Sequence, residues 1–261
     1  MYQGQEQQQA HQMIVRFSLR AVALAVTLAV TAAASIATAI PAAAQAANSG
    51  TFDLEIKGFR AGVLQFNATS TGSGYAVAGR LESTGIAAMI RKIRYDAKAS
   101  GGFSAGRWSP SRYEEQADTG KRQSQSLMEY HGGVPTEMIK ESREGRANYV
   151  DPATQGGTVD PLTALYATLR DVAPADACNL KLVMFDGARR SQITLAAAEQ
   201  TGDSITCAGE YRRLDGFSDK EMAEKQRFPF RLTYGPGEAG MVRVVEVSMD
   251  SLYGRASLTR R

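Results

Sequence analysis

The chain has 261 residues, in which 30 Lys and Arg against 27 Asp and Glu leave a formal net charge of +3. Because the basic residues are scattered and nearly balanced by acidic ones, the composition argues against a nucleic-acid-binding protein. With two His and two Cys in the whole chain, borderline and soft metal ions would lack the imidazole and thiolate clusters they prefer, so we expect neither a metal site nor a cofactor.

The N-terminal segment has the order of a secretory signal peptide. Arg16 and Arg20 form a positive region, residues 21–40 form an apolar, Ala-rich run, and Ala44-Gln45-Ala46 fits a small-x-small cleavage site. We therefore expect residues 1–46 to be a signal peptide that is cleaved near Ala46.

The alternative for this segment is a membrane anchor, because residues 21–40 are long enough to cross a bilayer. The run is rich in Ala and Thr, no cluster of charges follows it, and the cleavage-site pattern favours removal. Residues 47–261 would then form a single β-rich periplasmic domain without a transmembrane segment, long enough to bury a core.

From residue 51 onward, apolar and polar side chains alternate with a period of two, which is typical of half-buried strands. Runs at 52–56, 64–69 and 75–81, separated by Gly-rich turns, predict three strands of an antiparallel meander. Further runs that predict strands lie at 94–100, 109–118, 122–130, 136–143, 179–186, 190–198, 204–213, 228–234, 241–250 and 252–259.

Two segments have a helical pattern instead. In residues 160–170, Asp160 can cap the free N–H groups of the first turn, and Pro161 fits a position where no N–H partner exists. Residues 85–93 place apolar side chains at spacings of three and four, which predicts a second short helix.

Many antiparallel strands with two short helices predict a mainly β fold. We expect one antiparallel sheet of about a dozen strands, curved into an open β-barrel or β-spiral that protects its edges. A sheet of this size leaves room for a partial cavity, with one or both helices as a plug or a lid. The alternative is a sandwich of two sheets with a packed core.

Both cysteines, Cys178 and Cys207, lie in the predicted mature domain. Two cysteines in an exported protein indicate one disulfide. A redox-active pair is usually close in sequence, and this pair is not. We expect a structural disulfide that joins adjacent C-terminal strands.

Several short pieces of the C-terminal half are distinctive of one family. These pieces are Asp160–Tyr166, Cys178 with Phe185–Arg190, Cys207 followed by Tyr211 and Gly216, and Ser251–Gly254. On these residues the chain resembles the domain of unknown function 3108 family, exported envelope proteins of Gram-negative bacteria. The resemblance implies a periplasmic, envelope-associated role with no assigned chemistry.

The apolar stripe of the shorter predicted helix is a candidate ligand-binding lid. It consists of Ile86, Met89, Ile90 and Ile93. In this hypothesis the stripe covers the mouth of a cavity, while Arg91, Lys92 and Arg94 face anionic lipid headgroups. The alternative is that the stripe packs on the sheet as part of the core.

One catalytic pattern occurs, because Gly102-Phe103-Ser104-Ala105-Gly106 matches the nucleophile elbow of serine hydrolases. The elbow requires a helix after the serine, and Arg107-Trp108-Ser109-Pro110 does not begin one. His131 is the sole candidate base of the predicted mature domain. We therefore expect a Gly-rich turn between strands rather than a catalytic residue, and a protein that is not an enzyme.

These expectations favour a periplasmic envelope protein that binds an apolar or amphipathic ligand, or a protein partner, in its curved sheet and supports envelope integrity. A lipid or an envelope protein is the expected partner. The alternative is a structural or interaction protein with a solidly packed barrel and no ligand.

Overall fold

The computed structural model describes residues 46–140, 149–252 and 254–261, so the predicted signal peptide up to residue 45 lies outside the described residues. Thirteen strands form one antiparallel sheet. They are β1 (Ala46–Ile56), β2 (Phe59–Ser70), β3 (Gly74–Ser83), β4 (Arg94–Ser104), β5 (Arg107–Asp118), β6 (Gln123–His131), β7 (Val134–Lys140), β8 (Leu180–Phe185), β9 (Arg190–Thr201), β10 (Ser204–Asp215), β11 (Arg227–Pro236), β12 (Val242–Ser251) and β13 (Gly254–Arg260).

The sheet is a meander whose first and last strands pair with each other. Its order runs from β7 through β6 to β1, continues to β13, and descends to β8. In the register of β1 with β13, Phe52 lies opposite Arg260 and Ile56 opposite Ala256. The prediction of a single antiparallel sheet is confirmed, and the alternative of two separate sheets is wrong.

Because β1 and β13, the first and last strands, pair inside the sheet, its two edge strands, β7 and β8, come from the middle of the chain. The segment between them links these edges. The 3-10 helix η1 (Pro152–Thr154) contacts β7, and Val159 forms a parallel bridge to Met184 of β8. The edges are thereby partly covered, which limits pairing with other chains.

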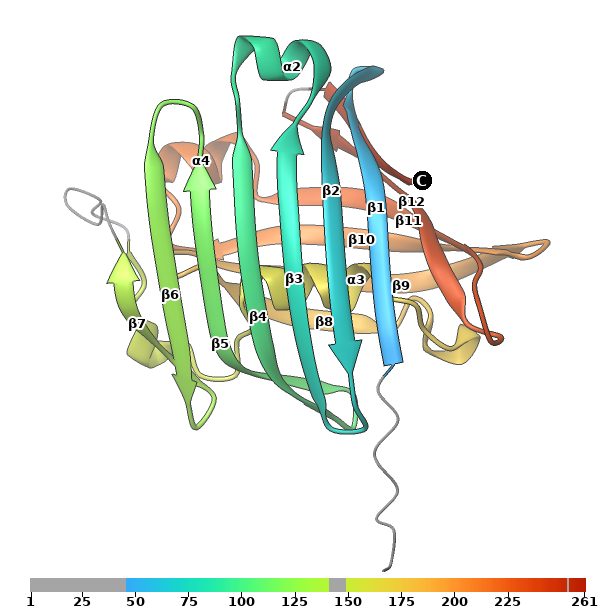
Figure 1. Cartoon of the computed structure of the whole chain (residues 1–261), viewed down its shortest axis with the longest axis horizontal. Helices are drawn as coiled ribbons and strands as arrows, with labels where there is room; N and C mark the ends of the chain where they lie inside the picture. Colours follow the sequence, from blue (N-terminus) through green and yellow to red (C-terminus); the bar gives the residue numbers. More distant parts are fainter. Residues whose placement is uncertain (1–45, 141–148, 253) are drawn as a thin grey trace, which may run out of the picture. The chain divides into compact units, whose positions relative to one another are not determined.

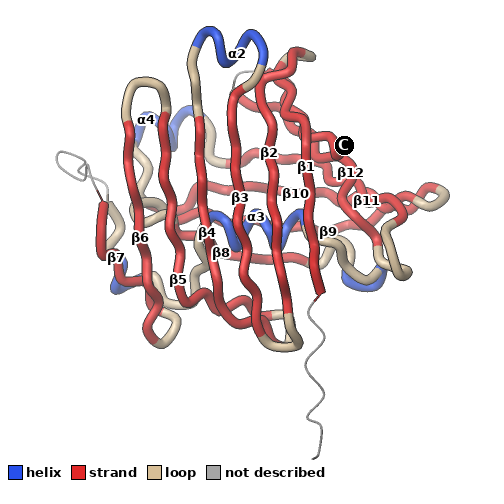
Figure 2. Tube along the Cα trace, viewed as in Figure 1, coloured by secondary structure: helices blue, strands red, loops and turns tan. Residues whose placement is uncertain are grey.

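Helix α3 (Pro161–Leu169) fills the space between the two halves of the curved sheet. It contacts β3, β4 and β5 on one side and β8 on the other, and Figures 1 and 2 show it behind β2–β4. Leu162, Tyr166 and Leu169 are buried. Gly79 of β3 permits the close approach, since a Cβ there would lie 2.7 Å from Leu162 Cδ1. Of the two predicted roles, this helix is therefore the plug.

The start of α3 is fixed by a buried polar network. Asp160 is fully buried, accepts a hydrogen bond from the Thr163 N–H at 2.8 Å, and accepts another from Thr163 Oγ1 at 2.6 Å. Thr163 Oγ1 in turn lies 2.8 Å from the Tyr75 hydroxyl of β3. The N-cap predicted from Asp160 and Pro161 is confirmed, and it also joins the helix to the sheet.

The remaining helices differ from the predicted pair. Helix α2 spans Gly85–Ile90 and stops there, because Arg91 is extended, so the predicted extent of 85–93 was too long. Helix α4 (Asp219–Glu224) was not predicted, although Ser218 and Glu221 form a complete capping box at its start. A further 3-10 helix, η2, spans Pro174–Asp176.

Cys178 and Cys207 form the predicted disulfide, with their Cα atoms 5.2 Å apart. The expectation that it joins adjacent strands was wrong. Cys178 lies in the loop before β8 and Cys207 lies in β10, with β9 between these two strands. The bond therefore ties the loop at the edge of the sheet across β9 to a strand further inside.

Candidate functional site

Helix α2 exposes its apolar side chains instead of burying them. Ile86, Met89 and Ile90 are 69%, 87% and 82% exposed, whereas Ile93, which follows the helix, is half-buried. The alternative that the stripe packs on the sheet is therefore wrong for the first three residues. The helix is carried by the connection between β3 and β4 and contacts β2.

The exposed apolar side chains of the described residues gather at one end of the sheet. The large hydrophobic residues that are exposed are Phe59, Ile86, Met89, Ile90 and Leu252. We call this set the apolar tip. It occupies the β1–β2 turn, α2 and the β12–β13 turn, and Figure 1 shows the first two together at the upper end of the strands.

Backbone contacts join these connections into one surface. The Lys57 N–H donates to the Arg255 carbonyl at 2.8 Å, which joins the β1–β2 and β12–β13 turns. The Thr84 N–H donates to the Ala61 carbonyl at 3.1 Å, which holds the start of α2 against β2. At Gly120 in the β5–β6 turn, a Cβ would lie 2.8 Å from the Lys92 carbonyl, so this turn lies beside the end of α2.

Basic side chains surround the apolar tip. The four connections and the adjoining strand ends, residues 57–60, 84–94, 119–122, 252 and 254–255, contain no Asp or Glu, although Asp118 and Asp250 lie just outside them. Their basic residues are Lys57, Arg60, Arg91, Lys92, Arg94, Lys121, Arg122 and Arg255, which we call the basic collar.

Among the described residues, ion pairs hold two members of the collar: Arg60 pairs with Asp53, and Arg94 pairs with Asp96. The hydrogen bond from Arg94 lowers the pKa of Asp96 below its usual value. Of the three basic residues predicted to face lipid headgroups, Arg94 is thus engaged within the protein. Arg91 and Lys92 are exposed and have no such pairing in the described part of the chain.

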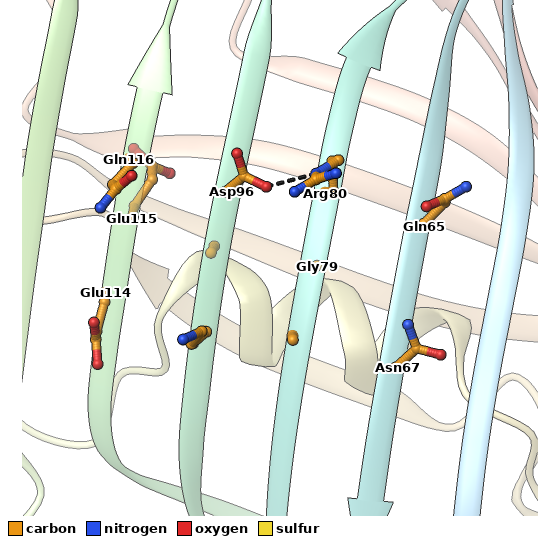
Figure 3. Close-up of a pocket in the computed structure, with 11 residues that line it drawn as sticks. Gln65, Asn67, Gly79, Arg80, Asp96, Glu114, Glu115 and Gln116 are labelled. Carbon is orange, nitrogen blue, oxygen red and sulfur yellow. Dashed lines mark hydrogen bonds and ion pairs between the residues drawn. The ribbon is translucent and has the colours of Figure 1, made fainter.

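The outer face of β2–β5 carries a second polar region, around a pocket of about 440 Å³ (Figure 3). Gln65, Arg80, Asp96 and Gln116 lie opposite one another on neighbouring strands. Arg80 Nε donates to Asp96 Oδ1 at 2.6 Å, the contact drawn in Figure 3. Because these charges neutralise each other, the region has the character of a solvated sheet face.

A larger pocket of about 950 Å³ lies along the first half of β1 and is lined by Arg170, Asp171, Arg243 and Arg260. Arg243 Nη2 donates to Asp171 Oδ2 at 3.0 Å, which raises the pKa of Arg243. Burial instead lowers the pKa of Arg260. Helix α2 contributes no residue to this pocket.

The segment around Ser104 forms the turn between β4 and β5, and β5 begins at Arg107 where a nucleophile elbow would have a helix. His131 ends β6, is 75% exposed, and lies 4.0 Å from Glu129. Within the described residues, no three His, Cys, Asp or Glu side chains are placed to hold a metal ion. None of the described helices is long and apolar enough to cross a membrane.

Sequence reasoning found α2 and part of the collar but missed the rest of this surface. Phe59 directly follows the β1–β2 turn, and Leu252 lies in the β12–β13 turn. A large apolar residue at a hairpin turn is a local signal that could have indicated both. Arg170, Arg243 and Arg260 carry no such signal, because they come from separate parts of the chain.

Comparison with known proteins places the chain in a family. Residues 51–214, more than half of the chain, match the family described as "Protein of unknown function (DUF3108)". The chain belongs to the DUF3108 family. The match includes Asp160–Tyr166 and both cysteines and ends before Gly216, so part of the resemblance noted in the sequence lies beyond it.

Among solved structures, the DUF3108 chain is similar to a β-barrel-like protein of the domain of unknown function DUF1849 from Brucella abortus. The two share 11% sequence identity with a TM-score of 0.46, over 82% of this chain and 95% of the other. A comparison with curated protein sequences gives no match.

Proposed function

We propose that this DUF3108 protein is a non-enzymatic protein of the periplasm that docks on an anionic membrane surface through its apolar tip. One observation carries the proposal: the exposed large hydrophobic residues of the described chain all lie at one end of the sheet. A contiguous exposed apolar surface with a polar rim is typical of a site that meets a membrane or another protein.

The charge of the rim favours a membrane as the occupant. Each Lys or Arg near an anionic bilayer contributes about 1 kcal/mol, and each large apolar side chain that is fully buried contributes about 1.5–3 kcal/mol. Six members of the collar have no ion pair with the described acidic residues. A few apolar side chains and several such charges together give reversible, salt-sensitive binding.

In this proposal the apolar tip also binds the apolar or amphipathic envelope molecule, or the membrane-bound partner. The packing of α3 inside the curved sheet supports this position over a ligand held in the interior. In this proposal Ile86, Met89 and Ile90 touch the lipid themselves. Their predicted role as a lid over a cavity stays a prediction, as does the support of envelope integrity.

Export is part of the proposal and rests on the N-terminal pattern and the disulfide, which an oxidising compartment permits. Mass spectrometry of the protein recovered from periplasmic extracts checks it. We expect a chain that begins near Ala47 and has no free thiol, and recovery of an uncleaved, reduced chain from the cytosol would contradict it.

Flotation with vesicles tests the docking. We expect the protein to float with vesicles that contain phosphatidylglycerol, more weakly with pure phosphatidylcholine, and less at high salt. Met89→Asp removes the most exposed apolar side chain of the tip and should weaken binding about ten-fold or more, since 1.4 kcal/mol corresponds to a factor of ten.

The matched control is Gln116→Asp, which adds the same charge to an exposed position on the outer face of β5. It should leave flotation unchanged, whereas Arg91→Glu with Lys92→Glu should abolish the preference for phosphatidylglycerol. Equal flotation of Met89→Asp and Gln116→Asp, or no flotation of the natural chain, would overturn the proposal.

A further inference from the structure

The pocket of about 950 Å³ lies at a seam of the sheet. Strand β1 pairs with β13 only from Phe52 onward, while residues 46–51 of β1 continue beyond the end of β13, paired with β2 alone. The hydrogen bond from the Arg261 N–H to the Thr51 carbonyl, at 2.9 Å, marks this end. The pocket is closed by the end of α3 and by the β11–β12 turn.

Four arginines line the pocket at this seam: Arg170, Arg243, Arg260 and Arg261, the last of which pairs with Asp53. Arg260 is nine-tenths buried, and its Nε and Nη1 donate to the carbonyls of Val244 and Ser49 at 2.7 and 2.8 Å. Arg170 lies over the rings of Phe103 and Trp108, 5.1 and 5.5 Å from their centroids.

The nearby carboxylates do not balance these charges. Asp171 is shared, with Oδ2 bonded to Arg243 at 3.0 Å and Oδ1 lying 3.7 Å from Arg260 Nη2, too far for a hydrogen bond. Glu238 contacts Arg243 at 3.4 Å but is 89% exposed. Among the described residues, Arg170 has no carboxylate within ion-pair distance. The pocket therefore carries an excess of positive charge.

The pocket also collects buried polar atoms that form no hydrogen bond. In the described structure, nine buried side-chain nitrogen or oxygen atoms have no hydrogen bond, and five of them belong to residues that line this pocket. These five are Asn48 Oδ1, Arg170 Nε, Asp171 Oδ1, Arg243 Nε and Arg260 Nη2. Unpaired buried polar groups are costly and mark a place where a missing partner belongs.

We propose that the seam pocket binds a small polar molecule through a phosphate or carboxylate group. Guanidinium groups match the planar, two-oxygen geometry of such oxyanions, and Arg170, Arg243 and Arg260 all line the pocket. Polar side chains that line the pocket, among them Ser49 and Asn67, can form hydrogen bonds with hydroxyl groups of the same molecule. The volume exceeds that of a bare ion and fits a small organic ligand.

The position of the pocket favours a soluble molecule over a lipid headgroup. The pocket lies along the first residues of β1, whereas the apolar tip begins at the turn after its last residue, Ile56. A protein docked by the tip would hold the pocket away from the membrane. Most lining residues are polar, which suits a hydrophilic body rather than an acyl chain.

Titration calorimetry with inorganic phosphate and with glycerol 3-phosphate tests the proposal. We expect both to bind, glycerol 3-phosphate more tightly, with shifts of the Arg170 and Arg260 Nε–H resonances in NMR spectra. The Arg170 side chain donates no hydrogen bond to a backbone carbonyl in the described structure, so Arg170→Gln removes the charge without breaking such a bond. This substitution should weaken binding ten-fold to a hundred-fold.

Arg231→Gln is the control, because Arg231 is an exposed arginine paired with Glu199 on the outside of the sheet, and it should bind like the natural chain. If Arg170→Gln fails to fold, Arg243→Gln makes the same test. Absence of binding by both phosphates, or unchanged affinity in a folded Arg170→Gln protein, would overturn the proposal. A third result would show that the ligand is a lipid headgroup and not a soluble molecule. In that case glycerol 3-phosphate does not bind, whereas phosphatidylglycerol vesicles bind and Arg170→Gln abolishes their binding.

Discussion

At the scale of single residues, Asp160 is the only carboxylate among the buried residues of the described chain. It is fully buried, and burial raises its pKa to about 6, although the hydrogen bonds from Thr163 act in the opposite direction. The sequence predicted Asp160 as a helix cap, since a cap depends on local order. It did not predict the link through Thr163 to Tyr75, because that contact joins residues 88 positions apart.

This pKa gives stability a defined pH dependence. The folded-state pKa of Asp160 lies above the ordinary value of 3.8, so its contribution is fully present below about pH 4 and is lost as the pH rises through about 6. A shift of about two pKa units corresponds to about 3 kcal/mol.

Asp160→Asn keeps the cap, because its amide oxygen can accept from the Thr163 N–H, and it cannot ionise. Its amide nitrogen must donate to Thr163 Oγ1, where Asp160 accepts from that hydroxyl. Urea unfolding from pH 4 to pH 8 should show a variant that gains stability relative to the natural protein as the pH rises, by about 2–3 kcal/mol at pH 8. A difference that stays constant across this range would show that Asp160 does not titrate as its burial requires.

At the scale of elements, the disulfide is the tie whose energetic effect can be measured most simply. Cys178 and Cys207 are 29 positions apart, and Cys207 is fully buried. The closed loop contains all of β8 and β9, the edge strand and its neighbour. Loss of the bond would therefore increase the conformational freedom of the unfolded chain and loosen the edge of the sheet in the folded protein.

Replacing both cysteines by Ala should lower the free energy of unfolding by about 3–4 kcal/mol, the value the chain-entropy model gives for a loop of this length. Urea unfolding of the oxidised protein and of the double variant measures the difference. A loss below about 1 kcal/mol would mean that the edge is held by its other contacts alone.

The elements that could be predicted are those with local signals. Period-two alternation located β1, β2 and β3, and the predicted runs at 179–186 and 190–198 located β8 and β9. Helix α4 also has a local signal, because Ser218 followed three residues later by Glu221 is the spacing of a capping box. The early end of α2 had no local marker, because the chain after Ile90 is taken up by hydrogen bonds to Ser83.

At the scale of the whole domain, both proposed sites depend on the pairing of the first strand with the last. Pairing of β1 with β13 brings the β12–β13 turn beside the β1–β2 turn, which completes the apolar tip. The same pairing stops at Phe52 and Arg260, which opens the seam pocket. The sequence predicted the part of the apolar tip that lies on α2, but it predicted neither the β12–β13 turn beside it nor the seam pocket. Both of these depend on a register between residues about 200 positions apart.

The depth of a nitroxide label in a membrane tests the central claim most directly. The described chain has no free cysteine, so Met89→Cys and Gln116→Cys can be labelled singly. On addition of phosphatidylglycerol vesicles, the label at position 89 should become more accessible to dissolved oxygen and less accessible to a water-soluble nickel chelate. The label at position 116 should not change. A label at position 89 that stays as accessible to nickel as the one at 116 would contradict docking through the apolar tip.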